Sequence, residues 1–230
     1  MSMRQFNIFV EGNDDHDLVL ALLQELRAVS FDPTKKNKRP TSYLKAPATG
    51  DSILLFATGG WTKLVESEAL FRQANDSGGL NLIVFDADFD EAKYPSGGQA
   101  KRLAAIQSSV STFDSNPAVF LFPQPSEDGN LETLLLRLIQ PAHQQVMDCY
   151  DGYEACLSQC LDAQGQPVYY DTPSDKRRIY DYINVMPLSP LERERHQEKG
   201  GQKIFENPAW WNLHSSAIQP LRDFLNQYLP

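Results

Sequence analysis

The sequence predicts an α/β protein with a central, mainly parallel four-stranded sheet, helices on both faces, and a C-terminal helical extension. Three observations support this class. Short apolar runs punctuate the first half of the chain, segments with helical spacing lie between them, and the pattern changes from Cys149 onward. Strands that alternate with helices are typical of parallel sheets with right-handed crossovers.

The four expected strands are almost entirely apolar. Each has about five or six residues rich in Val, Ile, Leu and Phe, with little alternation between polar and apolar positions. A continuous apolar run is typical of a strand that is buried on both faces, as in a parallel sheet. The four runs are Phe6–Val10, Ile53–Ala57, Leu80–Phe85 and Ala118–Phe122.

The first expected helix follows the first strand directly. Leu18, Leu22 and Leu26 recur at helical spacing, which predicts one apolar face. Asp14 or Asp15 is suited to cap this helix and to complement its dipole. The remaining helices of the core are expected at 61–74, 99–110 and 131–147.

Prolines interrupt this pattern twice. Residues 32–50 are polar, contain three prolines and have no clear period, so we expect a long loop, which is usually functional or mobile. Pro141 should kink the fourth helix or end it near Gln140.

The chain is expected to have two parts. Residues 1–147 form the α/β core, and residues 148–230 form a helical, aromatic-rich extension packed on that core. The second part is rich in Tyr, Pro and charged residues. Its helical pieces are expected at 152–161, 175–183 and 217–229.

The composition excludes several classes of protein. A net charge of −9 over 230 residues leaves no general basic coat for non-specific binding of nucleic acid. No apolar run approaches the roughly 18–20 residues that span a bilayer, and the N-terminus lacks the apolar stretch of a signal peptide. Three cysteines, an odd number, argue against a disulfide framework. We therefore expect a cytoplasmic protein without a membrane partner, with its cysteines packed in the core.

Acidic residues follow two of the expected strands. Glu11 follows the first strand, and Asp86 and Asp88 follow the third. Ligands of open α/β sheets bind beyond the carboxyl ends of the strands, so these three side chains converge if the two strands are neighbours. Crowded carboxylates repel one another, and a divalent cation removes that penalty. Oxygen ligands favour Mg²⁺ or Mn²⁺ as the cofactor.

Two further acids are expected on the same side of the sheet. Asp15 comes four residues after Glu11 and would lie in the first turn of the first helix. Glu132 follows the fourth strand and would lie in the first turn of the fourth helix. A simpler interpretation stays open, because acids after strands often cap helices or form turns. Asp14 and Asp128 fit that simpler interpretation better.

At these residues the sequence resembles the Toprim superfamily. Its signature is Glu-Gly after the first strand and Asp-x-Asp after the third, matched by Glu11-Gly12 and Asp86-Ala87-Asp88. The chain looks most like the OLD-type nuclease branch and its small, standalone, uncharacterised bacterial relatives. That branch has a second acid at the position of Asp15, and the small relatives have Gly-x-Leu-Glu at 129–132. The resemblance covers roughly residues 5–140.

The resemblance implies a Toprim-like core with the activity of a metal-dependent nuclease, that is, a phosphodiester hydrolase. Asp86 and Asp88 would be Mg²⁺ ligands and Glu11 a ligand or general base, which makes these three the catalytic residues. Asp15 and Glu132 would help to hold a second metal ion. The implied substrate is nucleic acid, with DNA favoured over RNA, and the family context adds defence against phage or mobile elements. OLD proteins carry an ATPase domain, but this chain lacks a Gly-x-x-x-x-Gly-Lys-Ser/Thr loop. A separate ATPase partner and an oligomer stay open.

Two basic stretches are candidates for binding nucleic acid despite the acidic total. One is in the long loop and comprises Lys36, Lys38 and Arg39; the other is in the extension and comprises Lys176 and Arg177. A local patch of this kind can hold phosphates. The competing interpretation of each stretch is an ordinary solvated surface.

Other function classes stay open. The chain can be a catalytically inactive Toprim-like module that binds nucleic acid, a nucleotide or a partner protein. The Asp86-Ala87-Asp88 motif can also be compared with the nucleophile pair of haloacid dehalogenase phosphatases, but that pair normally follows the first strand. Response-regulator receivers also have acids after strands 1 and 3, but their paired acids after strand 1 fit Glu11-Gly12 poorly.

Overall fold

A computed structural model gives the fold of the chain and describes residues 3–27, 29–31, 41–91, 95–114, 116–197 and 202–230. The chain forms two compact units, one comprising Met1–Leu134 with Leu213–Pro230 and the other Leu135–Asn212. These units divide the chain differently from the expected boundary after residue 147, since the last helix belongs with the first unit. No helix among the described residues is long and apolar enough to cross a membrane.

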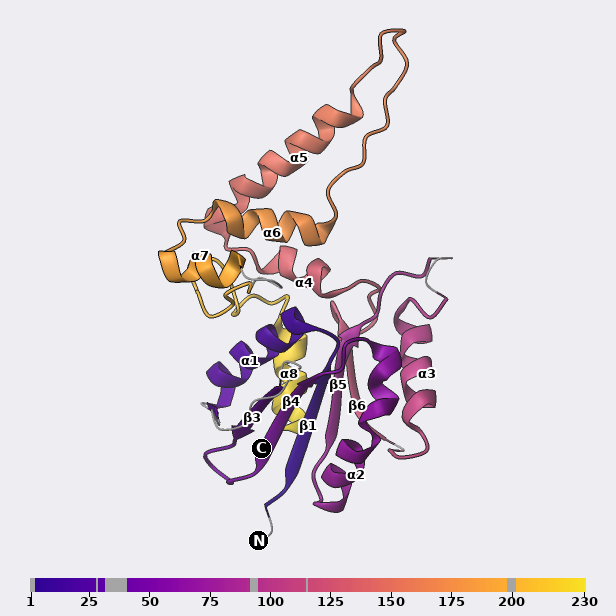
Figure 1. Cartoon of the computed structure of the whole chain (residues 1–230), viewed down its shortest axis with the longest axis vertical. Coiled ribbons are helices and arrows are strands. Elements are labelled where there is room, and N and C mark those ends of the chain that lie inside the picture. Colours follow the sequence, from indigo (N-terminus) through magenta and orange to yellow (C-terminus); the bar gives the residue numbers. More distant parts are fainter. Residues whose placement is uncertain (1–2, 28, 32–40, 92–94, 115, 198–201) are drawn as a thin grey trace. The chain divides into compact units, whose positions relative to one another are not determined.

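The first unit is an α/β unit built on a mixed sheet (Figure 1). Within the described residues the sheet has six strands in the order β2-β3-β4-β1-β5-β6. The strands are β1 (Gln5–Val10), β2 (Ser30–Phe31), β3 (Thr41–Lys45), β4 (Ser52–Ala57), β5 (Asn81–Asp86) and β6 (Ala118–Phe122).

The sheet is wider than the expected four strands. The four apolar runs form β4, β1, β5 and β6, which are parallel to one another. β3 adds to β4 in the antiparallel direction, and β2 adds to β3 in the same way. β3 lies in the segment expected to be a loop. Its residues alternate between half-buried and buried positions, so it lacks the continuous apolar run that marks the parallel strands.

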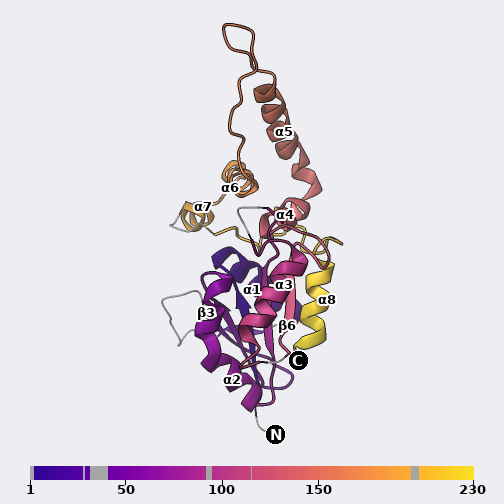
Figure 2. The same cartoon turned by 90° about the vertical axis from the view of Figure 1, so that its right-hand side faces the viewer.

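Helices cover both faces of this sheet (Figure 2). On one face Phe9 of β1 stacks on Phe71, with ring centroids 4.3 Å apart, and an apolar cluster continues to Ile106. On the other face Phe120 of β6 contacts the ring of Phe224. The first face carries η1 (Trp61–Ser67), α2 (Glu68–Asp76) and α3 (Gln99–Val110), and the second carries α1 (Asn13–Arg27) and α8 (Gln219–Tyr228).

The second unit is helical. α4 (Leu131–Leu138) runs into it from the first unit and ends before Pro141, as the sequence predicts. Its apolar centre includes Tyr182, whose ring lies 5.6 Å from that of Trp211. The other helices are η2 (Pro141–His143), α5 (Gln144–Ser158), α6 (Asp175–Val185) and α7 (Pro190–Gln197).

The cysteines do not pack in a core. Cys149 and Cys156 are exposed on α5, and Cys160 just beyond the helix is half-buried. The expectation of buried cysteines was therefore wrong. Seven- and four-residue spacing puts cysteines on one helix face, but it does not say whether that face is covered.

Candidate functional site

The carboxyl ends of β1 and β5 lie side by side and bring the first acids together. The two strands are parallel neighbours, with Val10 paired to Val84. Glu11 follows β1 directly, and Asp86 is the last residue of β5. The sequence-based expectation that these strands are neighbours is therefore met.

Glu11 is held by the loop that follows β4. The backbone N–H of Trp61 donates to Glu11 Oε1 over 2.8 Å, and the N–H of Gly59 donates to the Glu11 carbonyl over 2.9 Å. Burial raises the pKa of the Glu11 carboxyl, while the nearby charge of Arg102 opposes that rise. Burial thus makes Glu11 a stronger base than an exposed glutamate.

Asp15 lies in the first turn of α1 and is 6% exposed. Its Oδ2 accepts the N–H of Gly12 over 2.9 Å, but its buried Oδ1 has no hydrogen-bond partner. Burial, and then the neighbouring charge of Glu11, raise the pKa of Asp15 to about 7. A buried oxygen without a donor is costly, so this atom is suited to receive a cation.

Asp86 is the centre of the acidic group. Its Oδ1 accepts the N–H of Leu131 at the start of α4 over 2.7 Å. Burial raises the pKa of Asp86 well above its usual value, and the charges of Asp15, Glu11 and Glu132 raise it further, in that order. Glu11, Asp15, Asp86 and Glu132 therefore belong to one electrostatic cluster, and the charge of Asp88 also raises the pKa of Glu11.

Asp88 is the fifth predicted ligand and has a different environment. Its carboxylate accepts a hydrogen bond from Arg102 Nη2. Its backbone has a φ of 57°, a conformation that Asp tolerates better than most residues. The N–H of Gly129 donates to the Asp88 carbonyl over 3.0 Å, which ties the loop after β5 to the loop before α4.

The structure explains why a glycine occupies position 129 of the 129–132 motif. Gly129 has a φ of +147°, and a Cβ at this position would lie 2.9 Å from Thr133 Oγ1 and 3.1 Å from Pro123 Cδ. A side chain would therefore disturb the turn that carries the Asp88 contact and leads into α4.

Arg102 is the site residue that the sequence analysis missed. It lies on α3, is 3% exposed, and its guanidinium lies 4.9 Å from the centroid of the Trp61 ring. Nε and Nη1 are buried without hydrogen-bond partners. The available signal was its spacing, because Arg102 shares the buried stripe of α3 with Ile106 and Val110. A charged residue on an apolar stripe is unusual unless it is paired.

The donor set suits a hard cation, although the side chains do not form a ready-made chelate. Among the described residues, no group of three or more His, Cys, Asp and Glu side chains could hold a metal ion. The acids nevertheless share the features of carboxylate ligands, which are usually hydrogen-bonded by a second shell. Glu11, Asp15 and Asp86 each accept a backbone N–H through one oxygen.

Comparison with known proteins places the whole chain in one family. The model of a family described as a protein of unknown function, DUF3226, matches residues 5–230. The chain belongs to the DUF3226 family. A crystal structure of a hypothetical protein from Pyrococcus horikoshii is similar, with a TM-score of 0.50 and 14% identity, and the match covers 98% of this chain and 95% of that one. At this identity the likeness concerns the fold alone. A search of curated proteins finds no match.

Of the predicted nucleic-acid residues of this DUF3226 chain, the two that the structure describes belong to a different unit from the acidic cluster. Lys36, Lys38 and Arg39 lie outside the described residues. Lys176 and Arg177 are exposed on α6 in the second unit. Arg177 Nε also donates to Asp181 Oδ2 over 2.7 Å, so part of its charge is offset locally.

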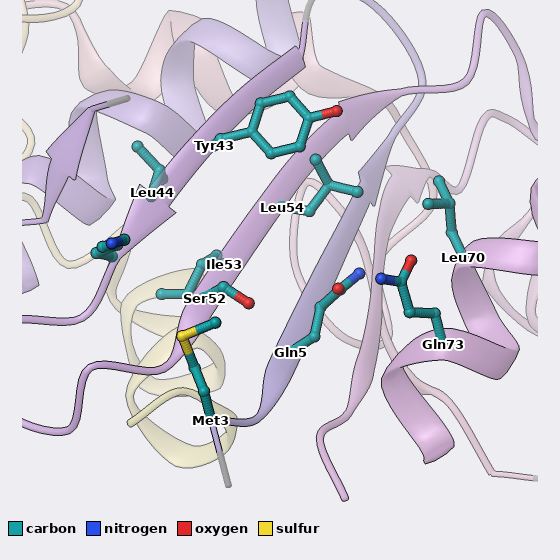
Figure 3. Close-up of a pocket in the computed structure, with 10 residues that line it drawn as sticks. Met3, Gln5, Tyr43, Leu44, Ser52, Ile53, Leu54, Leu70 and Gln73 are labelled. Carbon is teal, nitrogen blue, oxygen red and sulfur yellow. The ribbon is translucent and has the colours of Figure 1, made fainter. Parts of the chain in front are cut away.

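A hollow of about 550 Å³ lies at the opposite end of the same sheet. Gln5 and Ser52, which begin β1 and β4, line it together with Tyr43 of β3 and Gln73 of α2 (Figure 3). None of the predicted site residues that the structure describes lines this hollow. The hollow is therefore separate from the acidic cluster and contributes nothing to its chemistry.

Proposed function

We propose that this DUF3226 chain is a Toprim-type, Mg²⁺-dependent phosphodiester hydrolase that acts on nucleic acid, with DNA favoured over RNA. The observation that carries the proposal is the convergence on Asp86 of three other carboxylates, from the ends of β1 and the starts of α1 and α4. The resemblance extends the proposal to a role in defence against phage or mobile elements.

Electrostatics supports a divalent cation at this cluster. Partly or fully buried carboxylates that face one another either keep protons or need a compensating positive charge. Asp15, Asp86 and Glu132 would hold Mg²⁺ or Mn²⁺ through oxygen atoms, which these ions prefer, and Glu11 would be left to act as a base. The unpartnered Oδ1 of Asp15 is the atom that gains most from such a ligand. When bound, the ion would stabilise negative charge on the phosphoryl oxygens.

The chain's own residues account for the other parts of the reaction. Hydrolysis forms a bond from a water oxygen to phosphorus and breaks the bond to the leaving sugar oxygen. Glu11 is suited to accept the proton of the attacking water, because burial raises its pKa and general bases work best with a pKa near the working pH. Arg102 would contribute fixed positive charge beside Asp88.

The second candidate is the inactive binding module, and one contact favours it. Arg102 already pairs with Asp88, so a protein side chain neutralises one of the five carboxylates. In such a module the acids would keep protons in place of a metal ion, and a nucleotide, nucleic acid or protein would bind without being cleaved.

Nicking of supercoiled plasmid DNA separates the two candidates. The full chain is incubated with Mg²⁺ or Mn²⁺, beside Asp86→Asn and Asp76→Asn. Asp76 is exposed on α2, so its variant removes the same charge away from the site. We expect metal-dependent nicking by the wild type and by Asp76→Asn, and a loss of about a hundredfold or more in Asp86→Asn.

Two results would count against hydrolysis. Retention of DNA on a gel without nicking supports the binding module. Nicking that survives in Asp86→Asn points to a contaminant or to another site. Thermal unfolding of each variant shows whether a loss of activity is only a loss of folded protein.

A further inference from the structure

The second unit contains a hairpin-like arm formed by residues 144–174. α5 leads out to a turn, and the chain returns to α6 in an extended conformation (Figures 1 and 2). The turn is ordered by its own hydrogen bonds, from Asp162 N–H to the Gln166 carbonyl and from Val168 N–H to the Cys160 carbonyl, each 2.9 Å long. The arm therefore has a defined conformation.

The arm buries very little of its own surface. Met147 is the one buried residue in the 15 residues of α5, and this helix packs on α6 and η2. An isolated helix of this length is marginal in water, because helices in proteins derive most of their stability from a packed apolar face. Such a helix gains stability when a partner covers it.

Large apolar side chains are exposed along the arm. Tyr169 is 93% exposed, and Tyr153, Leu161 and Tyr170 are each more than half exposed. Exposed tyrosines are frequent at protein interfaces, since each combines a large apolar ring with a polar end. Single exposed apolar residues need no explanation, but a series of them on one arm marks an interaction surface.

The charge of the arm limits the kind of partner. Residues 144–174 contain five acids and no Lys or Arg: Asp148, Asp151, Glu154, Asp162 and Asp171. Asp151 is paired with Arg178 of α6 at 2.5 Å; the remaining acids still leave the arm negative. A nucleic acid or the same arm of a second copy would meet charge of like sign.

We propose that the arm is a docking element for a partner protein that presents a basic surface with an apolar face. The tyrosine rings and Leu161 pack on the apolar face, and the acids of the arm meet Lys or Arg at its rim. This arrangement follows the usual division of an interface into an apolar centre and a polar rim. The proposal concerns a different surface from the acidic cluster and does not depend on hydrolase activity.

The test uses synthetic helical peptides as the probe. A labelled 20-residue amphipathic peptide of Leu and Lys is titrated with the full chain, and its binding is followed by fluorescence anisotropy. Two matched peptides have Glu in place of Lys or Ser in place of Leu. We expect the Leu/Lys peptide to bind at least tenfold more tightly than either, because the arm requires both basic charge and apolar contact.

Variants locate the binding to the arm. The triple variant Tyr153→Ser, Tyr169→Ser, Tyr170→Ser keeps the charge of the arm and should weaken binding of the Leu/Lys peptide at least tenfold. Its control is Val185→Ser with Leu191→Ser, which removes two apolar side chains that are also more than half exposed in the same unit but outside the arm. Hydrogen exchange should slow in α5 when the peptide binds. Thermal unfolding should show that both variants remain folded.

Several outcomes would overturn the proposal. Absence of binding, equal binding of the Ser/Lys peptide, or unchanged binding by the tyrosine variant would each show that the arm does not dock a basic surface with an apolar face. A dimer in light scattering that the tyrosine variant abolishes would identify a second copy as the occupant. Loss of DNA retention in that variant would identify nucleic acid.

Discussion

Arg102 on α3 and Asp88 after β5 form an ion pair near the carboxyl ends of β1 and β5, where the acids converge. The arginine side chain is 3% exposed and the aspartate side chain 31% exposed, so the positive charge is the buried partner. A buried positive charge beside a cluster of carboxylates lowers their mutual repulsion. In a metal-binding site, Arg102 would therefore compete with the ion for the same negative charge.

Replacing Arg102 with methionine should strengthen metal binding. Arg102→Met keeps an apolar stem against Trp61 and removes the charge, so Mg²⁺ should bind about tenfold more tightly at pH 8. Without metal the variant should be less stable than the wild type, because the carboxylates lose a compensating charge. Calorimetric titration with Mg²⁺ and thermal unfolding with and without Mg²⁺ measure the two effects.

The control for this substitution is the adjacent lysine. Lys101 is exposed and pairs with Asp90 at 2.5 Å, so Lys101→Met removes one positive charge beside the site without touching it. Its affinity for Mg²⁺ should stay within about twofold of the wild type. Weaker metal binding in Arg102→Met would show that the arginine orients Asp88 and does not compete with the ion.

Replacing Asp15 with asparagine should stabilise the metal-free protein at alkaline pH. The pKa of Asp15 is raised to about 7 in the fold, against about 3.9 in an unfolded chain. The folded state therefore holds this proton more tightly, and the wild type loses stability as the pH rises from about 4 to 7. Asp15→Asn removes the buried charge, so its free energy of unfolding at pH 8 should exceed that of the wild type by a few kcal/mol. The variant should therefore unfold at a higher denaturant concentration.

Two comparisons show whether charge causes that difference. The difference in the free energy of unfolding between Asp15→Asn and the wild type should shrink towards zero below pH 4, where Asp15 carries a proton in both the folded and the unfolded state. Asp76→Asn, which removes an exposed acid, should not reproduce this pH profile. Addition of Mg²⁺ should stabilise the wild type more than Asp15→Asn, and equal stabilisation of both would exclude Asp15 as a ligand.

The parallel part of the fold was predictable from the sequence because those strands are buried on both faces. β1 and β5 are rich in apolar residues, and consecutive positions in both strands are buried, as expected for strands covered on both faces. β3 was missed because it alternates half-buried and buried positions over only five residues. A short strand of this kind depends on pairing with β4, which the sequence does not show.

The acids of the site were predictable and their electrostatic partners were not. Glu11 and Asp86 could be placed together because both follow neighbouring parallel strands. Arg102 reaches Asp88 from another element, 14 residues along the chain, and only the packing of α3 determines which way it points. The exposure of α5 was also unpredictable, because it depends on what the surrounding chain leaves uncovered.

Replacing Gly129 with alanine should impair both the fold and the site. The new Cβ would meet Thr133 Oγ1, and the φ of +147° suits glycine alone, so we expect a loss of about 1–3 kcal/mol in stability. The start of α4 should shift and weaken the hydrogen bond from Leu131 to Asp86. Denaturant unfolding and Mg²⁺ titration measure these effects.

A second substitution tests the cause. Thr133→Ala removes the Oγ1 that the alanine Cβ would meet, so adding it to Gly129→Ala should recover part of the lost metal affinity. If the losses of Mg²⁺ affinity in the two single variants simply add in the double variant, the contact with Thr133 does not cause the loss in Gly129→Ala. The backbone conformation would then account for it.

Asp51 should make the protein sensitive to acid, with a sign opposite to that of Asp15. The buried Asp51 carboxylate accepts two hydrogen bonds from Arg4, one from Nη2 over 2.7 Å and one from the backbone N–H over 2.9 Å. The hydrogen bond from the Arg4 side chain is the main cause that lowers the pKa of Asp51 to about 2. The unfolded chain binds this proton more tightly, so stability is lost as the pH falls from about 4 to 2.

Together the two aspartates predict a stability maximum near pH 4 in the absence of metal. Asp51→Asn should lower stability at pH 7 and make unfolding less dependent on pH between 2 and 4, while leaving the decline between pH 4 and 7 in place. Asp15→Asn should make that upper decline shallower, because Asp86 and Glu11, whose pKa values are also raised, still contribute to it, and should leave the acid limb unchanged. Mg²⁺ should raise stability only on the upper limb, where the carboxylates are ionised, so denaturant unfolding across pH 2–8 measures all three effects. A metal effect at pH 3 would show that the ion binds elsewhere.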